Sequence, residues 1–344
     1  MKFNLSILTI VLVATGICLF ILDLLLGSVA IPFSAIIDIL LGNEVENQSW
    51  QLILMEARFP RAVAAILSGS ALAVSGLQMQ TLFRNPLAGP YILGISSGAG
   101  LGVAVFIMGF AVLGISASTI DWLANYGIVI SAVLGAVAIL LILMAAIAKL
   151  KDIMTVLILG IMIGSVATAL ISIMEYFSSE ESLKSFVLWT MGDLSSVSSN
   201  SLTLLLVLVV FGVAGAFAIS KQLNAYLLGE EYAQTLGVNV KTTRYLVILI
   251  TALLAGAITA FCGPIGFVGI IVPHIARMLL KTSNHFQLVP VSVLLGLNIM
   301  LLADIIAQLP GSDKTLPINA VTSLIGIPII LWIILKNKKI AALN

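Results

Sequence analysis

The sequence is dominated by long apolar stretches that are separated by short polar ones. Ten stretches approach the roughly 20 residues that a helix needs to cross a bilayer. They lie near residues 5–27, 62–82, 92–110, 124–148, 154–176, 201–220, 244–262, 265–280, 288–309 and 317–335. The third and the eighth are short and are interrupted by glycine or proline. We therefore predict an all-α polytopic membrane protein with about ten transmembrane helices, which form a single domain over residues 1–344.

Composition narrows the class of protein further. Hydrophobic residues make up 60% of the chain and charged residues 9%, and the mean hydropathy is +1.20. Ordinary soluble domains carry about 25% charged residues. The net charge of +1 argues against nucleic acid as a partner. Cys18 and Cys262 both lie in apolar stretches, so we expect two core thiols and no disulfide.

The distribution of basic residues predicts how the chain is oriented in the membrane. With the N-terminus inside, four of them fall in outer segments: Arg58, Arg61, Lys184 and Lys314. The other twelve fall in inner segments: Lys2, Arg84, Lys149, Lys151, Lys221, Lys241, Arg244, Arg277, Lys281, Lys336, Lys338 and Lys339. Because basic residues accumulate on the cytoplasmic side, both termini are predicted to be cytoplasmic. Residues 222–241 are then cytoplasmic as well.

One inner segment, QLNAYLLGEEYAQTLGVNVK at residues 222–241, is polar but patterned. Its apolar positions predict a short helix over Ala225–Thr235 that contains Gly229 and is closed by Gly237. The segment is too short and too charged to cross a bilayer. It is either an ordinary connecting loop or a docking surface for a soluble partner that acts on the membrane domain.

Two arginines depart from the charge bias on the outer side. Arg58 and Arg61 stand in EARFPRAV, at the start of the second apolar stretch. Their guanidinium groups could reach lipid headgroups along the apolar surface. Alternatively, they are planar donors directed at the carboxylates of a partner on the outer side.

Two apolar regions are interrupted by helix-breaking residues. The breaks contain Asn85, Pro86, Gly89 and Pro90 in the first half and Gly263, Pro264 and Gly266 in the second. Non-helical backbone at membrane depth must be buried in protein or line a cavity. Each half therefore has a helix rich in small residues, a break and a short helix. Because five helices per half is an odd number, the second half is predicted to be inverted relative to the first.

The remaining polar residues point to helix packing more than to chemistry. His274 and Arg277 share one helix face, where packing is favoured over a metal or haem contact. The only other histidine, His285, is placed in an inner loop, so one chain cannot supply a multi-histidine metal site. Asp304 is expected to be hydrogen-bonded between helices, although a carboxylate within a span can also mark function. Neither a P-loop sequence nor H-E-x-x-H occurs, so we expect no enzymatic activity, no metal site and no cofactor in this chain.

Four stretches in order along the chain carry a family resemblance. They are RFPRAVAAILSGSALAVSGLQMQTLFRNPLAGPYILGISSGAGLG, LLGEEYAQTLGVNV, GPIGFVGIIVPHIARMLL and LLADIIAQL. They resemble the FecCD family, the permease subunits of type II ABC importers for iron–siderophores, haem and cobalamin. The resemblance implies a homodimer around a pathway lined largely by the fifth and tenth helices. It also implies two cytoplasmic ATPase subunits that hold ATP and Mg²⁺, a periplasmic substrate-binding protein, and a place in the bacterial inner membrane.

The same resemblance assigns roles to particular residues. Arg58 and Arg61 match the R-x-P-R motif that meets acidic residues of the binding protein. The segment that contacts the ATPase would include Leu228, Gly229, Glu230, Glu231, Ala233, Leu236 and Gly237. The inner gate between the fourth and fifth helices would include Lys151, Asp152 and Thr155.

These observations lead to one predicted function and one alternative. The chain is predicted to be the membrane permease subunit of an ATP-driven importer that moves an iron–siderophore, or a related chelate such as cobalamin or haem, by alternating access. The alternative is a secondary transporter driven by an ion gradient, since such carriers also use inverted repeats and broken helices. A proton- or sodium-coupled carrier usually places carboxylates at the membrane midplane. Because this chain has few ionisable residues in its apolar stretches, the first function is favoured.

Overall fold

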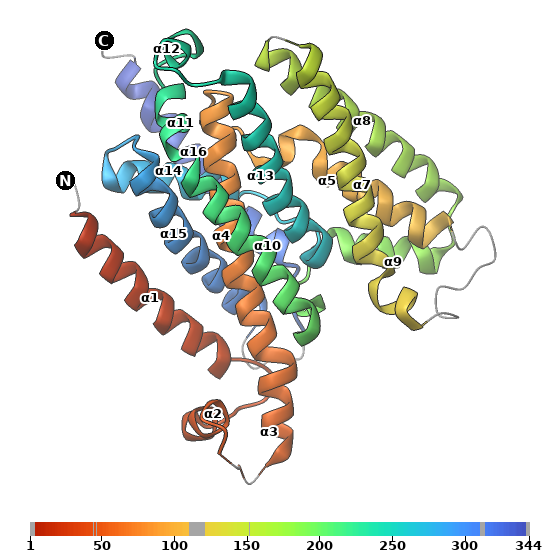
Figure 1. Ribbon diagram of the computed structural model, residues 1–344. Helices are drawn as coiled ribbons and strands as arrows, with labels where there is room; N and C mark the ends of the chain where they lie inside the picture. Colours follow the sequence, from red (N-terminus) through yellow and green to blue (C-terminus); the bar gives the residue numbers. More distant parts are fainter. Residues whose placement is uncertain are drawn as a thin grey trace.

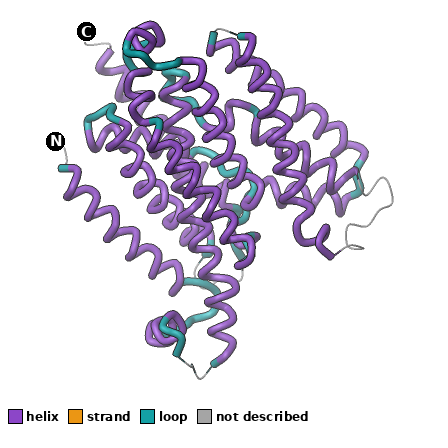
Figure 2. The backbone as a smooth tube through the Cα atoms, in the orientation of Figure 1, coloured by secondary structure: helices purple, strands orange, loops and turns teal. Residues whose placement is uncertain are grey.

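The computed structural model describes residues 4–43, 45, 47–109, 121–150, 152–309 and 314–341. Within these residues all regular secondary structure is helical (Figure 1, Figure 2). Ten helices form the bundle: α1 (Leu5–Leu25), α4 (Phe59–Leu82), α5 (Ile95–Ala104), α7 (Asp121–Lys149), α8 (Ile153–Phe177), α10 (Ser199–Ala218), α13 (Val240–Cys262), α14 (Val268–Leu280), α15 (His285–Ala307) and α16 (Ile318–Ala341). A π-helical turn, η3 (Val105–Gly109), extends α5.

Each of the ten apolar stretches contains one of these helices, so the prediction of about ten membrane helices is confirmed. Seven helices of the described chain are long and apolar enough to cross a membrane. Three further apolar helices are shorter, at Ile95–Gly109, Val268–Leu280 and Ile318–Trp332. The first two belong to the third and eighth stretches, where glycine and proline shorten the helix.

Shorter helical segments connect the bundle helices. They are α2 (Phe33–Leu40), α3 (Gln48–Ile53), η1 (Leu54–Arg58), η2 (Pro90–Leu93), α9 (Glu180–Thr190), η5 (Leu194–Ser196), α11 (Ser220–Tyr226) and α12 (Glu230–Thr235). Figure 1 shows α12 and both ends of the chain toward one end of the bundle, with α2 and α3 at the opposite end. The predicted topology likewise puts residues 222–241 on the same side as both termini.

The second bundle helix begins earlier than the sequence predicts. α3, η1 and α4 form one continuous helix of 35 residues, Gln48–Leu82, whereas the apolar stretch begins near residue 62. Pro60 therefore lies within a helix. The π-helical turn Leu54–Arg58 precedes it and relaxes the regular hydrogen-bond ladder in which proline cannot donate. As a result, Arg58 and Arg61 lie on the wall of a helix and not at its start.

α4 and α13 form the centre of the bundle. In the most apolar window of Gln48–Leu82 89% of the residues are buried, and in α13 78%, against 17–22% in α1, α7, α8 and α10. α4 and α13 pack against each other and run in opposite directions (Figure 1). Each is followed by a break and a short helix, which is α5 or α14. Such an antiparallel relation between equivalent elements is what an inverted repeat requires.

Glycines allow α4 to approach its neighbours closely. A Cβ atom on Gly76 would lie 1.7 Å from the carbonyl oxygen of Gly269 in α14, and one on Gly69 would lie 2.1 Å from that of Gly296 in α15. Backbones this close leave no room for a side chain. The peripheral helices differ, because α1, α7, α8 and α10 expose many large apolar side chains. Such faces fit a lipid environment or a second subunit.

Candidate functional site

The polar segment 222–241 folds as two short helices, α11 and α12, on the end of the bundle. The prediction of a single helix over Ala225–Thr235 is wrong, because α11 ends at Tyr226 and Gly229, at φ +119°, separates it from α12. That φ is open to glycine and strained for other residues. Gly237 follows α12 at φ +79°, and its N–H donates to the carbonyl of Gln234 at 2.9 Å. Gly237 therefore closes the helix, as the sequence predicts.

α12 presents an apolar ridge to its surroundings. Leu228, Tyr232 and Leu236 are spaced four residues apart, and their exposed fractions are 63%, 69% and 62%. Glu231 is exposed beside them, whereas Ala233 is fully buried against the rest of the chain. Large apolar side chains that stay exposed on an ordered, charged segment are typical of a protein contact surface.

An ion pair fixes α12 on the bundle. A carboxylate oxygen of Glu230 accepts a hydrogen bond from the Arg244 guanidinium of α13 at 2.5 Å, and the other accepts one from the Tyr226 hydroxyl. Burial alone would raise the pKa of Glu230, but the hydrogen bonds from Arg244 and Tyr226 outweigh it and hold that pKa below its ordinary value. The carboxylate is therefore charged at neutral pH, and α12 is tied to α13.

The two outer arginines are engaged within the chain. Arg58 is only 8% exposed, and its guanidinium donates to the carbonyls of Leu24 at 2.9 Å, Leu25 at 3.2 Å and Val29. The Arg61 side chain is 15% exposed and forms a bidentate pair with Asp304 at 2.8–3.0 Å. Neither guanidinium reaches out from the surface. Binding-protein docking by these arginines stays a prediction, and it would require them to exchange their present acceptors.

Asp304 lies at the centre of a buried polar cluster between helices. It is fully buried and accepts hydrogen bonds from Arg61 of α4 and from Gln308 at 3.1 Å. The Gln308 amide also donates to Asp23 of α1 at 2.6 Å. The cluster joins α1, α4 and α15, so the expectation of a packing role for Asp304 is confirmed. Arg277 similarly donates to Gln80 and joins α14 to α4.

The two breaks meet in the middle of the bundle. The first contains Asn85, Pro86 and Gly89 and leads into η2, which starts at Pro90. The second contains Gly263, Pro264 and Gly266, between α13 and α14.

One hydrogen bond joins the two breaks, and another joins the second break to α16. The Tyr91 hydroxyl of η2 accepts from the N–H of Ile265 at 3.2 Å. The N–H of Gly266 donates to the side chain of Asn319 in α16 at 2.9 Å. Side chains thus satisfy backbone groups that the broken helices leave free, as irregular backbone at membrane depth requires.

A cavity of about 390 Å³ separates the first break from α8. Its polar lining comes from Tyr91 and Ser97 on one side and from Ser165 and Thr168 of α8 on the other. α8 also touches the break directly through glycine: a Cβ atom on Gly160 would lie 3.0–3.2 Å from the backbone of Leu93. The Ser165 and Thr168 hydroxyls donate to carbonyls one turn earlier in α8, at 3.0 and 2.9 Å, so their hydrogens are satisfied within the helix and their oxygens can still accept a hydrogen bond.

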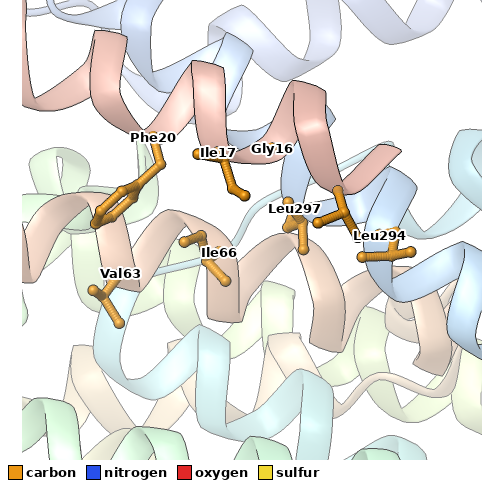
Figure 3. Close-up of a pocket in the computed structure, with 8 residues that line it drawn as sticks. Gly16, Ile17, Phe20, Val63, Ile66, Leu294 and Leu297 are labelled. Carbon is orange, nitrogen blue, oxygen red and sulfur yellow. The ribbon is translucent and has the colours of Figure 1, made fainter. Parts of the chain in front are cut away.

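A second cavity, of about 320 Å³, lies between α1, α4 and α15 (Figure 3). Figure 3 shows Phe20 and Ile17 of α1 facing Ile66 of α4 and Leu297 of α15 across it. Its lining is apolar throughout, so it offers nothing that could orient a polar ligand or hold a charge.

The predicted inner gate is only partly within the described residues. Lys151 lies outside them. Asp152 caps α8, and its carboxylate accepts from the N–H of Met154 at 3.2 Å and from the N–H and hydroxyl of Thr155 at 3.0 and 2.9 Å. The hydrogen bonds from Thr155 and Met154 lower the pKa of Asp152. Asp152 and Thr155 thus fix the start of α8, and their role as a gate stays a prediction.

The comparison with known proteins assigns the family. Residues 12–336 match the FecCD transport family. The chain belongs to that family. It is 36% identical to the hemin transport system permease HmuU of Yersinia pestis over 87% of this chain and 88% of that protein. It is 35% identical to the vitamin B12 import system permease BtuC of Klebsiella pneumoniae over 84% of both chains. A solved structure described as an inward-facing metal-chelate type ABC transporter superposes with a TM-score of 0.80 at 29% identity, covering 97% of this chain and 100% of that one.

The FecCD match begins within α1, ends within α16 and includes all the bundle helices between them. It confirms the resemblance on which the sequence analysis relied, and it identifies the chain as a multi-pass membrane protein. Sequence reasoning missed one group of residues in this FecCD protein. His285, placed in an inner loop, begins α15 and is fully buried, where its ring contacts Thr81 of α4 and Asn224 of α11. The three residues are far apart in sequence, and no local pattern marks their contact.

Proposed function

We propose that this FecCD protein is the permease subunit of an ATP-driven importer that carries a metal chelate into the cell by alternating access. An iron–siderophore is the first candidate cargo, with haem and cobalamin next. One observation carries the proposal: the α11–α12 pair is ordered, tied to the bundle by Arg244, and exposes an apolar ridge. The sequence contains no P-loop, and a partner ATPase that supplies the energy would bind such a surface.

The proposed assembly has four kinds of contact. Two cytoplasmic ATPase subunits, which hold ATP and Mg²⁺, bind the α12 ridge. A second copy of this chain packs against apolar faces of the bundle, and α8 and α16 expose several large apolar residues, including Leu324 and Trp332. A substrate-binding protein docks on the opposite end, near Arg58 and Arg61. Lipid covers the remaining apolar surface.

The cavity beside α8 is the proposed section of the pathway within this chain. Its hydroxyl oxygens can accept hydrogen bonds from a passing chelate, and none of the residues that line it carries a charge that would trap the cargo. Weak and replaceable contacts suit a conduit, because a transported molecule must leave as readily as it enters.

The decisive test is transport in vesicles. The permease is reconstituted with its candidate ATPase and binding protein, and uptake of a ferric siderophore, haem and cobalamin is measured with and without ATP. Uptake that requires both partners and ATP supports the proposal, and the preferred cargo names the substrate. Accumulation driven by an ion gradient in vesicles that contain only this chain would establish the secondary transporter instead.

The docking role of Arg61 needs a variant that leaves no buried charge behind. Arg61→Gln combined with Asp304→Asn removes both charges of the ion pair and leaves two neutral polar side chains in their place. If Arg61 binds a carboxylate of the binding protein, the affinity of docking falls in this double variant, whereas Asp304→Asn alone frees Arg61 and raises it. A folded double variant with the affinity of the wild type would exclude Arg61 from the docking surface.

A further inference from the structure

A buried hydrogen-bond cluster links the α11–α12 pair to the bundle. We call Thr81, Asn224, Asn284 and His285 the inner cluster. The Asn224 amide nitrogen donates to Asn284 Oδ1 at 2.9 Å. Asn224 Oδ1 accepts from the backbone N–H of His285 at 2.8 Å and lies 2.8 Å from His285 Nδ1. On the other side of the ring, His285 Nε2 lies 2.8 Å from the Thr81 hydroxyl.

The partners in the inner cluster determine where its hydrogens lie. Asn284 Oδ1 accepts from the N–H of Phe286, which makes it an acceptor and fixes the Asn224 amide nitrogen as the donor. Asn224 Oδ1 is then an acceptor as well, so His285 Nδ1 carries the ring hydrogen. Nε2 is left as an acceptor for the hydroxyl of Thr81. That hydroxyl has one hydrogen and a second acceptor, the carbonyl of Leu77 in its own helix at 2.9 Å. Because the Leu77 carbonyl also accepts the regular helical hydrogen bond, donation to Nε2 leaves no member of the cluster unsatisfied, and such networks are costly to break.

The inner cluster joins three elements that would otherwise be independent. Asn224 belongs to α11, Thr81 to the last turn of α4, and His285 to the first turn of α15. His285 is fully buried and Thr81 nearly so. A second contact reinforces the connection, because Arg84, just after α4, donates to the carbonyl of Tyr226 at the end of α11 at 3.1 Å. α11 therefore cannot shift without moving the ends of α4 and α15 or breaking buried hydrogen bonds.

The end of α4 leads directly to the cavity beside α8. The chain leaves α4 at Leu82, passes through the first break and enters η2, whose Tyr91 lines the cavity. Gln80 also binds α14, since its amide donates to the carbonyl of Ile270 at 3.0 Å. A displacement at α11 thus has a short, hydrogen-bonded route to the cavity wall.

We infer that Thr81, Asn224 and His285 are positioning residues that carry the displacement of α11–α12 into α4 and the cavity wall. The inference rests on the proposed function, in which a partner ATPase moves that helix pair. In this arrangement α11 transmits the displacement to α4 and α15. The Glu230–Arg244 pair holds α12 in the orientation that the partner binds.

The test compares transport with ATP hydrolysis in the reconstituted complex of permease, ATPase and binding protein. Thr81→Val keeps the shape of the side chain and removes its hydroxyl. We expect the amount of cargo moved per ATP to fall about threefold or more, with assembly and the rate of hydrolysis unchanged. Thr81→Ser restores the hydroxyl and should restore the ratio. The double variant Thr81→Val with Asn224→Ala should be no worse than Asn224→Ala alone, because both act through one cluster.

Thr243→Val is the matched control. Thr243 is also buried at the same end of the bundle, and its hydroxyl donates to the carbonyl of Asn239, four residues earlier, at 2.9 Å. The Thr81 hydroxyl lies at the same distance from the carbonyl of Leu77, also four residues earlier, but in addition lies 2.8 Å from His285 of another helix. This variant should keep the wild-type ratio. An unchanged ratio in Thr81→Val, or a fall matched by Thr243→Val, overturns the inference. Loss of ATPase binding in Thr81→Val also overturns it, since the cluster would then only shape the docking surface. If the wild-type complex itself shows no ATP-dependent uptake, it is the proposed function that fails.

Discussion

The close approach of α4 and α14 gives the sharpest prediction, which is the effect of Gly76→Ala. The added Cβ atom would lie 1.7 Å from the carbonyl oxygen of Gly269, and nearer than 3.0 Å such contacts are essentially never seen. The two backbones must therefore separate by more than an ångström. Overpacking a dense interior costs about 1–3 kcal/mol, and contact with backbone belongs at the upper end because no side chain can turn away. A helical alanine recovers about 1 kcal/mol relative to glycine, so we expect a net loss of about 2 kcal/mol.

The measurement is reversible unfolding of the purified protein in mixed micelles by SDS, followed by tryptophan fluorescence. Gly256→Ala in α13 is the control, because the nearest atom to its new Cβ would be 3.8 Å away. That variant should equal the wild type or be up to about 1 kcal/mol more stable. A Gly76→Ala protein as stable as the wild type would refute the close approach. An equal loss in both variants would show that helix flexibility, and not contact, is responsible.

Arg61→Met leaves Asp304 buried without its cation and should lower the free energy of unfolding by roughly 3–5 kcal/mol. Adding Asp304→Leu should restore most of that stability in the same unfolding assay. An equal loss of stability in the single and the double variant would exclude the ion pair as the cause. The pKa of Glu230 is depressed, so its pair with Arg244 contributes stability above the ordinary glutamate range and loses it as pH falls through the depressed pKa. The protection of α12 amides from hydrogen exchange, measured relative to the intrinsic rate at each pH, should then be high at neutral pH and low in acid, and low at both pH values in Glu230→Gln. Gly237→Pro removes the N–H that closes α12 and forces φ negative, so transport per ATP should fall, whereas Gly237→Asn tolerates the left-handed backbone and should behave as the wild type. Normal coupling in Gly237→Pro would make the segment a simple connector.

The bundle could be predicted from the sequence because hydropathy is a local property. Every apolar stretch of suitable length contains a helix, Pro86 lies in the break that follows α4, and Gly263 marks the end of α13. Local pattern could not reveal the split at Gly229, because a glycine within a helical pattern is compatible with either a continuous helix or a positive φ. The sequence pattern also did not predict the π-helical turn before Pro60. Through this turn the helix continues outward to Gln48.

The partners of the charged residues could not be predicted at all. Arg61 and Asp304 are 243 residues apart in sequence, and nothing local distinguishes an arginine paired inside the bundle from one that faces a partner. The same holds for Arg58, whose acceptors are main-chain carbonyls that carry no sequence signature. The family resemblance supplied a role for both arginines in the assembly, while only the structure supplied their contacts within the subunit.

The glycine contact of α8 has a structural consequence. Helices usually lock together because ridges of side chains on one fit the grooves of the other. At Gly160, α8 instead meets the backbone of Leu93 with no side chain between them. A bare contact of this kind leaves no room for a larger residue, because a Cβ atom at position 160 would lie 3.0–3.2 Å from the backbone of Leu93 and would force it to give way by a few tenths of an ångström. The distance between α8 and the first break, and with it the size of the cavity that they line, therefore depends on the absence of one side chain.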